Sequence, residues 1–292
     1  MTELRAIAGE KDAGRKLKYF VRGDMRVSYG QFQSLKRGGG LRVNGEIARA
    51  DRLLRPGDRI ALLLPESDAP RAVEAETGDV RIVYEDADVY VIDKSAPLAC
   101  QCTSRQPSGT LENRLCARFG EGFVFRPLNR LDRGTSGLMA AAKHAHACQL
   151  LQRQLHTPGF VREYLAIVEG ALTGEGRIEL PIAKAEGATV RREVNAARGQ
   201  YAATRYRAEA QGNGRTLVRL RLETGRTHQI RVHMAAIGHP VAGDFLYGME
   251  IPALPGRFAL HSAHIEFDHP LSGARIALDA PLPPKLRELM SE

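Results

Sequence analysis

The stretch "NRLDRGTSGL" (Asn129–Leu138) seats one carboxylate, Asp132, between two guanidiniums, Arg130 and Arg133. Strand-like apolar residues flank the stretch on both sides, so Asp132 is expected on a loop that is supported at both ends. Such loops commonly carry catalytic residues. The guanidiniums favour the ionised carboxylate, which suits a nucleophile or a base. From this spacing alone, a salt bridge that fixes a turn is an equally good interpretation.

The bulk composition indicates a basic globular protein. The 292-residue chain is 43% hydrophobic and carries a net charge of +8, with a pI of about 9.5. An excess of positive charge favours a polyanionic partner such as nucleic acid. No apolar run approaches the ~18 residues of a membrane span, and the charged N-terminus lacks the apolar core of a secretory signal. We therefore expect a cytoplasmic protein without membrane association.

Residues 1–64 are predicted to form a small N-terminal domain. Two short helices are expected in "KLKYFVRG" and "SYGQFQSLKRGGG", and the second should begin after Ser28 as N-cap and end at Gly38. The Asn-Gly pair between "LRV" and "EIA" is a strong signal for a type I′ hairpin. A further strand is expected in "RIALLL".

The larger C-terminal domain is predicted to span residues 79–292, after a linker at 65–78. Two prolines and an acidic bias in the linker disfavour a packed element. Predicted hairpins outnumber predicted βαβ units, so we expect an α+β fold with a mixed, largely antiparallel sheet and flanking helices. The expected strands lie in "RIVYEDADVYVIDKS", at 123–125, and in "SGLMAAAK", "REYLAIVEG" and "RTLVRLRLETG". The expected helices lie in "SGTLENRLCARFG", capped near Ser108 or Thr110, in "HAHACQLLQRQL", and in "RTHQIRVHMAAIG", with Thr227 as N-cap.

The chain resembles the RluA-type pseudouridine synthases across residues 80–285. The strongest element is "NRLDRGTSGL", set against a family pattern of His-Arg-Leu-Asp, two variable residues and Thr-Ser-Gly-Leu. The resemblance implies the pseudouridine synthase catalytic fold, isomerisation of a specific uridine to pseudouridine in RNA, and Asp132 as the essential aspartate. Asn129 replaces the family's His, and because Asn also donates and accepts hydrogen bonds, we expect adjusted activity and not its loss.

Three further segments carry the resemblance. In "REYLAIVEG", Tyr164 matches the tyrosine that stacks on the target base, although a half-buried strand aromatic is the plain structural interpretation. Arg162 replaces the usual Lys there. In "ETGRTHQIRVHMAAIGHPVAGDFLYG", Arg231 matches the partner of the catalytic Asp, and a buried arginine needs a carboxylate such as Asp132. In "RFALHSAHIEFDHP", Leu260 matches an apolar residue packed against the site. Other substrate contacts are expected from Asn129, Arg130, Arg133 and Arg226.

RNA contact is also expected from the N-terminal domain, which resembles the alpha-L RNA-binding module of a small-subunit ribosomal protein and of many RNA-modifying enzymes. The best-kept part is "GGGLRVNGEIARADRLLRPGDRI". The resemblance implies contacts from Lys36, Arg37 and Arg42, and it favours large-subunit ribosomal RNA over transfer RNA as the substrate. A solvated basic face is the alternative. The loop "DKSAP" at 93–97 keeps the family's Lys as Lys94 but otherwise departs from the pattern, so altered substrate contacts are expected there.

The implied reaction needs neither a cofactor nor a metal, because the bond to ribose breaks and re-forms at carbon 5 without net redox change. The target base must leave its stack to reach Asp132, and Arg130 and Tyr164 would offset that cost. The sequence does not decide whether Asp132 attacks the ribose or abstracts its 2′ proton.

Two other functions compete with this interpretation. A catalytically silent RNA-binding protein would use only the basic N-terminal domain. A metal-dependent hydrolase would use histidines, but His228 and His233 are five residues apart and do not share a helix face as an i, i+4 pair would. We expect structural histidines, no metal, and a monomer, since no exposed apolar stripe predicts a dimer. The histidines concerned are His228, His233, His239, His261 and His264.

Overall fold

The structure is a computed structural model that describes residues 2–64, 73–155 and 157–291. The chain divides into two compact units: the N-terminal residues with His144–Leu150 form the first, and the remainder forms the second. Of the predicted linker, residues 65–72 lie outside the described residues.

The last residues of the predicted linker belong to the second unit and are bonded within it, although they have no regular secondary structure. Asn113 Nδ2 donates to the Glu74 carbonyl (2.8 Å), and the Glu76 carboxylate accepts from the Gly109 amide (2.8 Å). The chain is therefore ordered against the second unit before its first strand begins.

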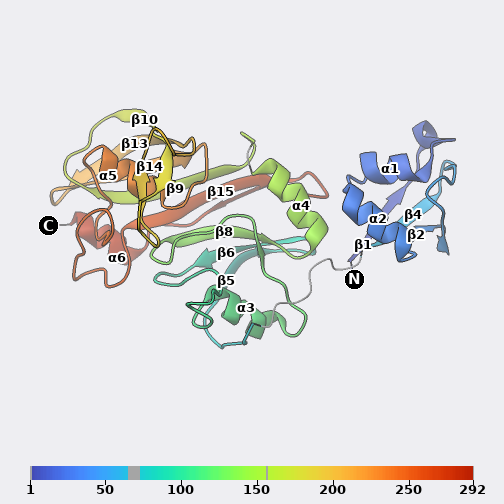
Figure 1. Ribbon diagram of the computed structural model, residues 1–292, viewed down its shortest axis with the longest axis horizontal. Helices are drawn as coiled ribbons and strands as arrows, with labels where there is room; N and C mark the ends of the chain where they lie inside the picture. Colours follow the sequence, from blue (N-terminus) through green and yellow to red (C-terminus); the bar gives the residue numbers. More distant parts are fainter. Residues whose placement is uncertain (1, 65–72, 156, 292) are drawn as a thin grey trace. The chain divides into compact units, whose positions relative to one another are not determined.

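Two helices and a four-stranded antiparallel sheet form the N-terminal part of the first unit (Figure 1). The sheet order is β1-β4-β2-β3, and the edge strand β1 was not expected from the sequence. Leu17, Leu35 and Leu62 are buried at the centre of its core. The elements are β1 (Thr2–Ile7), the 3-10 turn η1 (Glu10–Asp12), α1 (Leu17–Gly23), α2 (Tyr29–Arg37), β2 (Leu41–Val43), β3 (Glu46–Ile47) and β4 (Arg59–Leu64).

Local signals place the helices and the hairpin of this unit where they were predicted. The Ser28 hydroxyl accepts from the Gln31 amide while the Gln31 side chain accepts from the Ser28 amide, a reciprocal cap that starts α2. Gly38 caps its end. Asn44 and Gly45, between β2 and β3, have φ of 54° and 87°, the left-handed conformations of a type I′ turn.

A ten-stranded sheet organises the second unit, and this confirms the predicted α+β fold. Its order is β10-β13-β14-β9-β15-β8-β6-β5, with β16 on β15 and β7 on β8. Its strands are β5 (Arg81–Glu85), β6 (Val89–Lys94), β7 (Arg126–Pro127), β8 (Ser136–Ala142), β9 (Val161–Glu169), β10 (Glu175–Glu179), β13 (Ala203–Gly212), β14 (Arg215–Leu222), β15 (Leu260–Asp268) and β16 (Arg275–Asp279); a separate hairpin pairs β11 (Ile182–Lys184) with β12 (Arg192–Val194).

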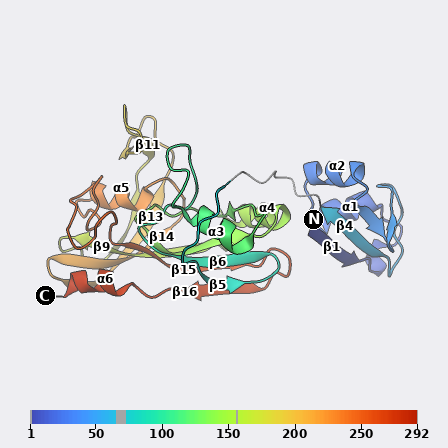
Figure 2. The ribbon, with the colours of Figure 1, turned by 90° about the horizontal axis from the view of Figure 1, so that it is seen from below.

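Helices cover this sheet and carry one wall of the functional site. Figure 2 shows α3 and α5 on one side of the sheet, with the β11–β12 hairpin projecting past α5. Thr110 caps α3, as one of the two residues predicted to do so. None of the helices in the described part of the chain has the length and apolar character of a membrane span. The helices of the second unit are α3 (Leu111–Phe119), α5 (Gln229–Ala236), α6 (Pro284–Arg287) and the 3-10 turn η2 (Glu288–Met290). The remaining helix, α4 (Ala145–Gln154), begins in the segment that is grouped with the first unit.

Two predicted boundaries are wrong. Residues 123–125 do not form a strand, because Phe123 folds back and stacks on Phe119 of α3 at 4.9 Å between ring centroids. The N-cap of α5 is His228 and not Thr227, because the Gln229 side chain closes the preceding turn.

The parallel pair β8–β15 joins the two halves of the sheet. Ser136 lies opposite His261, and Gly137 lies opposite Ser262. Gly137 has a φ of +105°, and a Cβ at this residue would lie 2.2 Å from the Ser262 carbonyl oxygen. The Ser262 hydroxyl also donates to the Leu138 carbonyl (2.8 Å). The close approach of these two backbones therefore requires glycine.

Gly137→Ala is expected to lower the free energy of unfolding by about 3–5 kcal/mol, because the methyl group must push two paired strands apart. Urea denaturation measures this. Gly273→Ala is the control: its φ is also positive (+74°), but its Cβ would meet nothing within 4 Å. That control should lose only about 1 kcal/mol. Equal losses in the two variants would contradict the steric argument.

Candidate active site

A cleft of about 700 Å³ in the second unit brings together the residues that the sequence singled out. Its walls come from the β7–β8 loop, β9, the start of α5 and the start of β15. Asp132, Tyr164, Arg231 and Leu260 all line it. The residues expected to contact substrate line it as well: Asn129, Arg130, Arg133 and Arg226.

Hydrogen bonds on both sides fix the loop that carries Asp132. The Thr135 amide donates to the Asp132 carbonyl (3.0 Å), and the Leu98 amide donates to the Arg133 carbonyl (2.9 Å). Lys94 supports Leu98 in turn, since its Nζ donates to the Leu98 carbonyl (2.8 Å). The loop is therefore held from the buried side by a segment that precedes it in the chain.

Lys94 is buried and does not line the cleft. Its Nζ donates to the Ser95 and Leu98 carbonyls, and burial lowers the pKa of Lys94 to about 8. Lys94 thus acts on the backbone behind Asp132, whereas the sequence departure in this loop had led us to expect an effect on substrate contacts.

Arg231 on α5 is the ion-pair partner of Asp132. Its Nη1 lies 3.0 Å from Asp132 Oδ2, and His228 Nε2 lies 3.9 Å from the same oxygen. Arg130 and Arg133 are exposed and, within the described residues, neither forms an ion pair with Asp132. The prediction that the flanking guanidiniums hold this carboxylate is therefore wrong. A hydrated guanidinium gains little from such a pair, whereas the buried Arg231 must be neutralised.

A second carboxylate, Asp244, was missed by sequence reasoning. It accepts two hydrogen bonds from Arg231, from Nε (2.6 Å) and from Nη2 (2.8 Å), and it is fully buried. The Phe258 ring lies against the guanidinium at 4.0 Å. Of the three N–H groups of Arg231 that Asp244 leaves unpaired, Asp132 accepts from one. The five donors of a buried arginine were the signal that more than one acceptor was needed.

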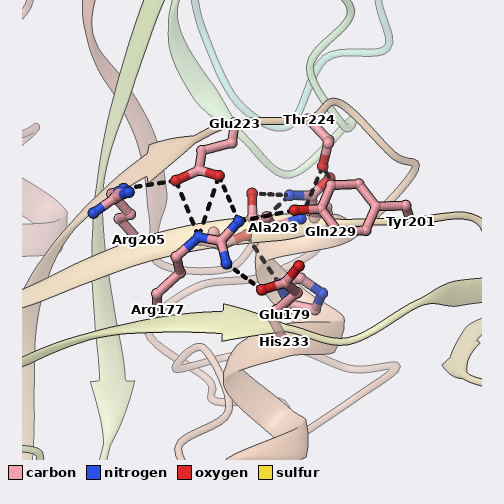
Figure 3. Close-up of polar contacts among 10 residues, drawn as sticks. Arg177, Glu179, Tyr201, Ala203, Arg205, Glu223, Thr224, Gln229 and His233 are labelled. Atoms are coloured by element: carbon pink, nitrogen blue, oxygen red, sulfur yellow. Dashed lines mark hydrogen bonds and ion pairs between the residues drawn. The ribbon is translucent and has the colours of Figure 1, made fainter.

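Figure 3 shows the polar contacts of Gln229 and His233 that anchor α5. Gln229 Nε2 donates to the Ala203 carbonyl (3.0 Å) and to the Thr204 hydroxyl (2.9 Å), and His233 Nδ1 lies 2.9 Å from the same hydroxyl. Gln229 and His233 are four residues apart and so share one face of the helix, which is held to β13. Arg231 lies between them and is directed to the other side.

An ion-pair network fixes the end of β14, just before the turn into α5 (Figure 3). Glu223 accepts from Arg177 Nη2 (2.9 Å) and from Arg205 Nε (2.6 Å). Arg177 also pairs with Glu179 and donates to the Tyr201 hydroxyl (2.8 Å). Single surface pairs contribute little, but this network links β10, β13 and β14 around one carboxylate.

Tyr164 on β9 and Leu260 on β15 form the apolar wall of the cleft. Leu260 lies opposite Ala166 in the register, so Tyr164 and Leu260 are diagonal neighbours on one face of the sheet. Burial raises the pKa of Tyr164, so its phenol remains neutral. The ring therefore offers an apolar surface for stacking.

Three polar side chains of the cleft differ in their burial and hydrogen bonding. Asn129 is buried; its Oδ1 accepts from the Ala140 amide (3.4 Å), and its Nδ2 has no hydrogen-bond partner within the described residues. Arg162 is buried with its Nε likewise unpaired there. Arg226 is exposed, and its Nε donates to the Tyr201 carbonyl (3.0 Å).

In the first unit, the three basic residues expected to bind RNA differ in exposure. Lys36 and Arg37 are exposed in the last turn of α2. Arg42 is half-buried, and its Nη1 donates to the Gly45 carbonyl (3.1 Å). Lys36 and Arg37 are thus the more accessible charges.

The five histidines of the metal hypothesis are engaged with separate protein groups. His261, for example, lies between the Ser136 hydroxyl (2.9 Å) and the Ala280 carbonyl (3.2 Å). Within the described residues, the group with metal-ligand geometry is a different one: Asp86, Asp88 and His269. The remaining ring contacts are His228 to Tyr247, His233 to Thr204 and Leu180, His239 to Glu169, and His264 to Asp279 and Glu266.

The sequence matches known RNA pseudouridine synthases, whose reaction fits the residues that line this cleft. Residues 88–236 match the family described as RNA pseudouridylate synthase. An uncharacterized RNA pseudouridine synthase of Bacillus subtilis is 36% identical over 273 residues, which cover 92% of this chain and 96% of that protein. The ribosomal large subunit pseudouridine synthase D of Xanthomonas campestris is 36% identical, over 85% of this chain and 80% of that protein.

Comparison with solved structures points to the same family. The solved structure of human RNA pseudouridylate synthase domain containing 1 matches with a TM-score of 0.59 at 27% identity, and the match covers 76% of this chain and 90% of that one. The chain therefore belongs to the RNA pseudouridylate synthase family, as the resemblance of its motifs to the RluA-type enzymes predicted.

Proposed function

We propose that Asp132 is the essential carboxylate with which this pseudouridine synthase isomerises one uridine in RNA. One observation carries the assignment: Asp132 lies in the cleft with one carboxylate oxygen bonded to Arg231 and the apolar wall of Tyr164 and Leu260 beside it. An ionised carboxylate is what a nucleophile or base requires, and Arg231 supplies the compensating charge.

The reaction moves uracil from nitrogen 1 to carbon 5 on the same ribose. The bond between C1′ and N1 breaks, the base turns within the cleft, and C1′ bonds to C5. The hydrogen on C5 leaves as a proton and N1 gains one, so no electrons are exchanged with another molecule. Asp132 serves either by adding to C1′ or by abstracting the 2′ proton, and both routes need the carboxylate beside the sugar.

The target uridine is expected to leave its stack and enter the cleft. Base flipping costs on the order of a few kcal/mol. Stacking on Tyr164 and contact with Leu260 offset that cost. Arg130, Arg133 and Arg226 are exposed guanidiniums lining the cleft, placed to contact the RNA backbone or to occupy the vacated stack.

Large-subunit ribosomal RNA is the proposed substrate, with transfer RNA as the alternative. The name of the Xanthomonas relative supports this choice. We assign residues 1–64 as an alpha-L-like RNA-binding module, 65–78 as a linker and 79–292 as the catalytic domain. The enzyme would act as a monomer in the cytoplasm, where ribosomal RNA is modified.

Asp132→Asn is expected to reduce turnover by at least about 10³-fold without loss of folding or RNA binding, because an amide is neither nucleophile nor base. The substrate is total RNA from cells lacking the gene, labelled with tritium at uridine carbon 5. Rejoining through C5 expels that hydrogen, so tritium released to water reports turnover.

The matched control is Asp51→Asn, the same change at an exposed carboxylate of the first unit, which should release tritium like the wild type. Wild-type-like release by Asp132→Asn would reject the assignment. RNA binding with no release by the wild type would instead favour a silent RNA-binding protein.

The double variant Lys36→Ala/Arg37→Ala is expected to weaken RNA binding while single-turnover chemistry at saturating enzyme stays unchanged. Loss of two phosphate contacts should lower the slope of log affinity against log salt by roughly 1.5. Filter binding across a salt series measures the slope. Lys285→Ala/Arg287→Ala removes the same charge from exposed residues of α6. An equal effect of both double variants would show that net charge alone matters, against a module that binds RNA.

A further inference from the structure

His228 has an unusual backbone conformation beside the proposed catalytic carboxylate. It is the N-cap residue of α5 and has φ 58° and ψ 19°, in the left-handed region. Non-glycine residues seldom adopt that region, and those that do concentrate at functional sites. Its Nδ1 lies 2.7 Å from the Tyr247 hydroxyl, and its Nε2 lies 3.9 Å from Asp132 Oδ2. The imidazole therefore lies between the Tyr247 hydroxyl and the Asp132 carboxylate.

The hydrogen bonds of Tyr247 indicate which ring nitrogen of His228 carries the proton. The Tyr247 hydroxyl accepts from the Arg192 amide (2.8 Å), and His228 Nδ1 is the acceptor placed to receive the hydroxyl's own proton. A neutral imidazole then carries its proton on Nε2, facing Asp132. The reverse tautomer would direct a lone pair at the carboxylate. Burial lowers the pKa of His228, which also favours the neutral ring.

Both neighbours of the Asp132 carboxylate act on the same oxygen. Arg231 Nη1 and His228 Nε2 face Oδ2, whereas Oδ1 has no hydrogen bond within the described residues. The 3.9 Å separation from His228 is longer than a hydrogen bond, but catalytic contacts commonly shorten once substrate completes a site. One oxygen is thus held, and the other is free for the ribose.

We propose that His228 is a positioning residue for Asp132: with its proton on Nε2, it joins Arg231 in holding Oδ2 and leaves Oδ1 to react. Tyr247 acts through His228 by fixing its tautomer. The β11–β12 hairpin acts through Tyr247, because the Arg192 amide holds the hydroxyl in place. This inference rests on the proposed role of Asp132 as the catalytic carboxylate.

Two amide substitutions separate this role from a structural one. In His228→Gln the amide N–H takes the place of Nε2, whereas in His228→Asn it takes the place of Nδ1 and does not reach Asp132. Asn adopts the left-handed conformation readily, so His228→Asn should fold at least as well as His228→Gln. With enzyme in saturating excess over the tritium-labelled total RNA, His228→Asn should release tritium about 100-fold more slowly than the wild type. His228→Gln should remain within about threefold, and RNA affinity should change in neither.

Tyr247→Phe tests the tautomer directly. It keeps the ring packed against the small cluster that contains Ile182 and Val232 while it removes the hydroxyl. The rate should fall about 10-fold, because part of the population then carries the proton on Nδ1. An amide has no tautomers, so adding Tyr247→Phe to His228→Gln should cost less than about twofold further. This non-additivity is a sign of coupling between the two residues.

Equal rates in the two amide variants, at any level, would overturn the proposal, provided that urea denaturation shows both to be folded. A wild-type rate in Tyr247→Phe would overturn the assigned tautomer. Asp132→Asn, run alongside, tells the two failures apart: turnover by that variant would reject the proposed function itself, whereas its inactivity together with equal rates in the amide variants would reject only the role of His228.

Discussion

A guanidinium buried among aromatic rings has to be neutralised by carboxylates, and the cleft of the second unit is arranged around that requirement. Asp244 takes two of the N–H groups of Arg231, and Asp132 takes a third. Asp244 also accepts from the Leu246 and Tyr247 amides, so the same carboxylate shapes the turn that carries Tyr247. Replacing Arg231 would leave the buried Asp244 carboxylate without its cation, and replacing Asp244 would remove the partner that takes two of the arginine's N–H groups.

Separate segments of the chain converge at the cleft, so each segment that carries a functional side chain has to be held in place by its own hydrogen bonds. The Asp132 loop is held from behind by Lys94 and Leu98, while α5 is held to β13 through Gln229 and His233. These supports are mostly buried hydrogen bonds, which are costly to leave unmade. The carboxylate and the guanidinium can therefore stay in register although they come from different elements.

Features that are determined by residues close together in the sequence, such as helix caps and tight turns, were predictable. Ser28 and Thr110 cap their helices, and the Asn-Gly turn pairs β2 with β3, because each signal acts over a few residues. The motifs singled out Asp132, Tyr164 and Arg231, and the structure places these three residues in one cleft. Asp244 and the bridge through His228 were not, since their partners are set by tertiary packing. The error over Arg130 and Arg133 has the same origin: the charges next to Asp132 in sequence are not the ones that pair with it in space.

The β8–β15 contact also bears on when the cleft can first form. Ser136 and His261, which face each other across that contact, are 125 residues apart in the chain. Strand pairing over such a separation has a high entropic cost and is intrinsically slow. A nascent chain that has displayed Asp132 but not yet Leu260 lacks one wall of its cleft. The walls of the cleft can therefore meet only once the residues up to Leu260 have been made, and a shorter chain lacks the apolar surface that Tyr164 and Leu260 form together.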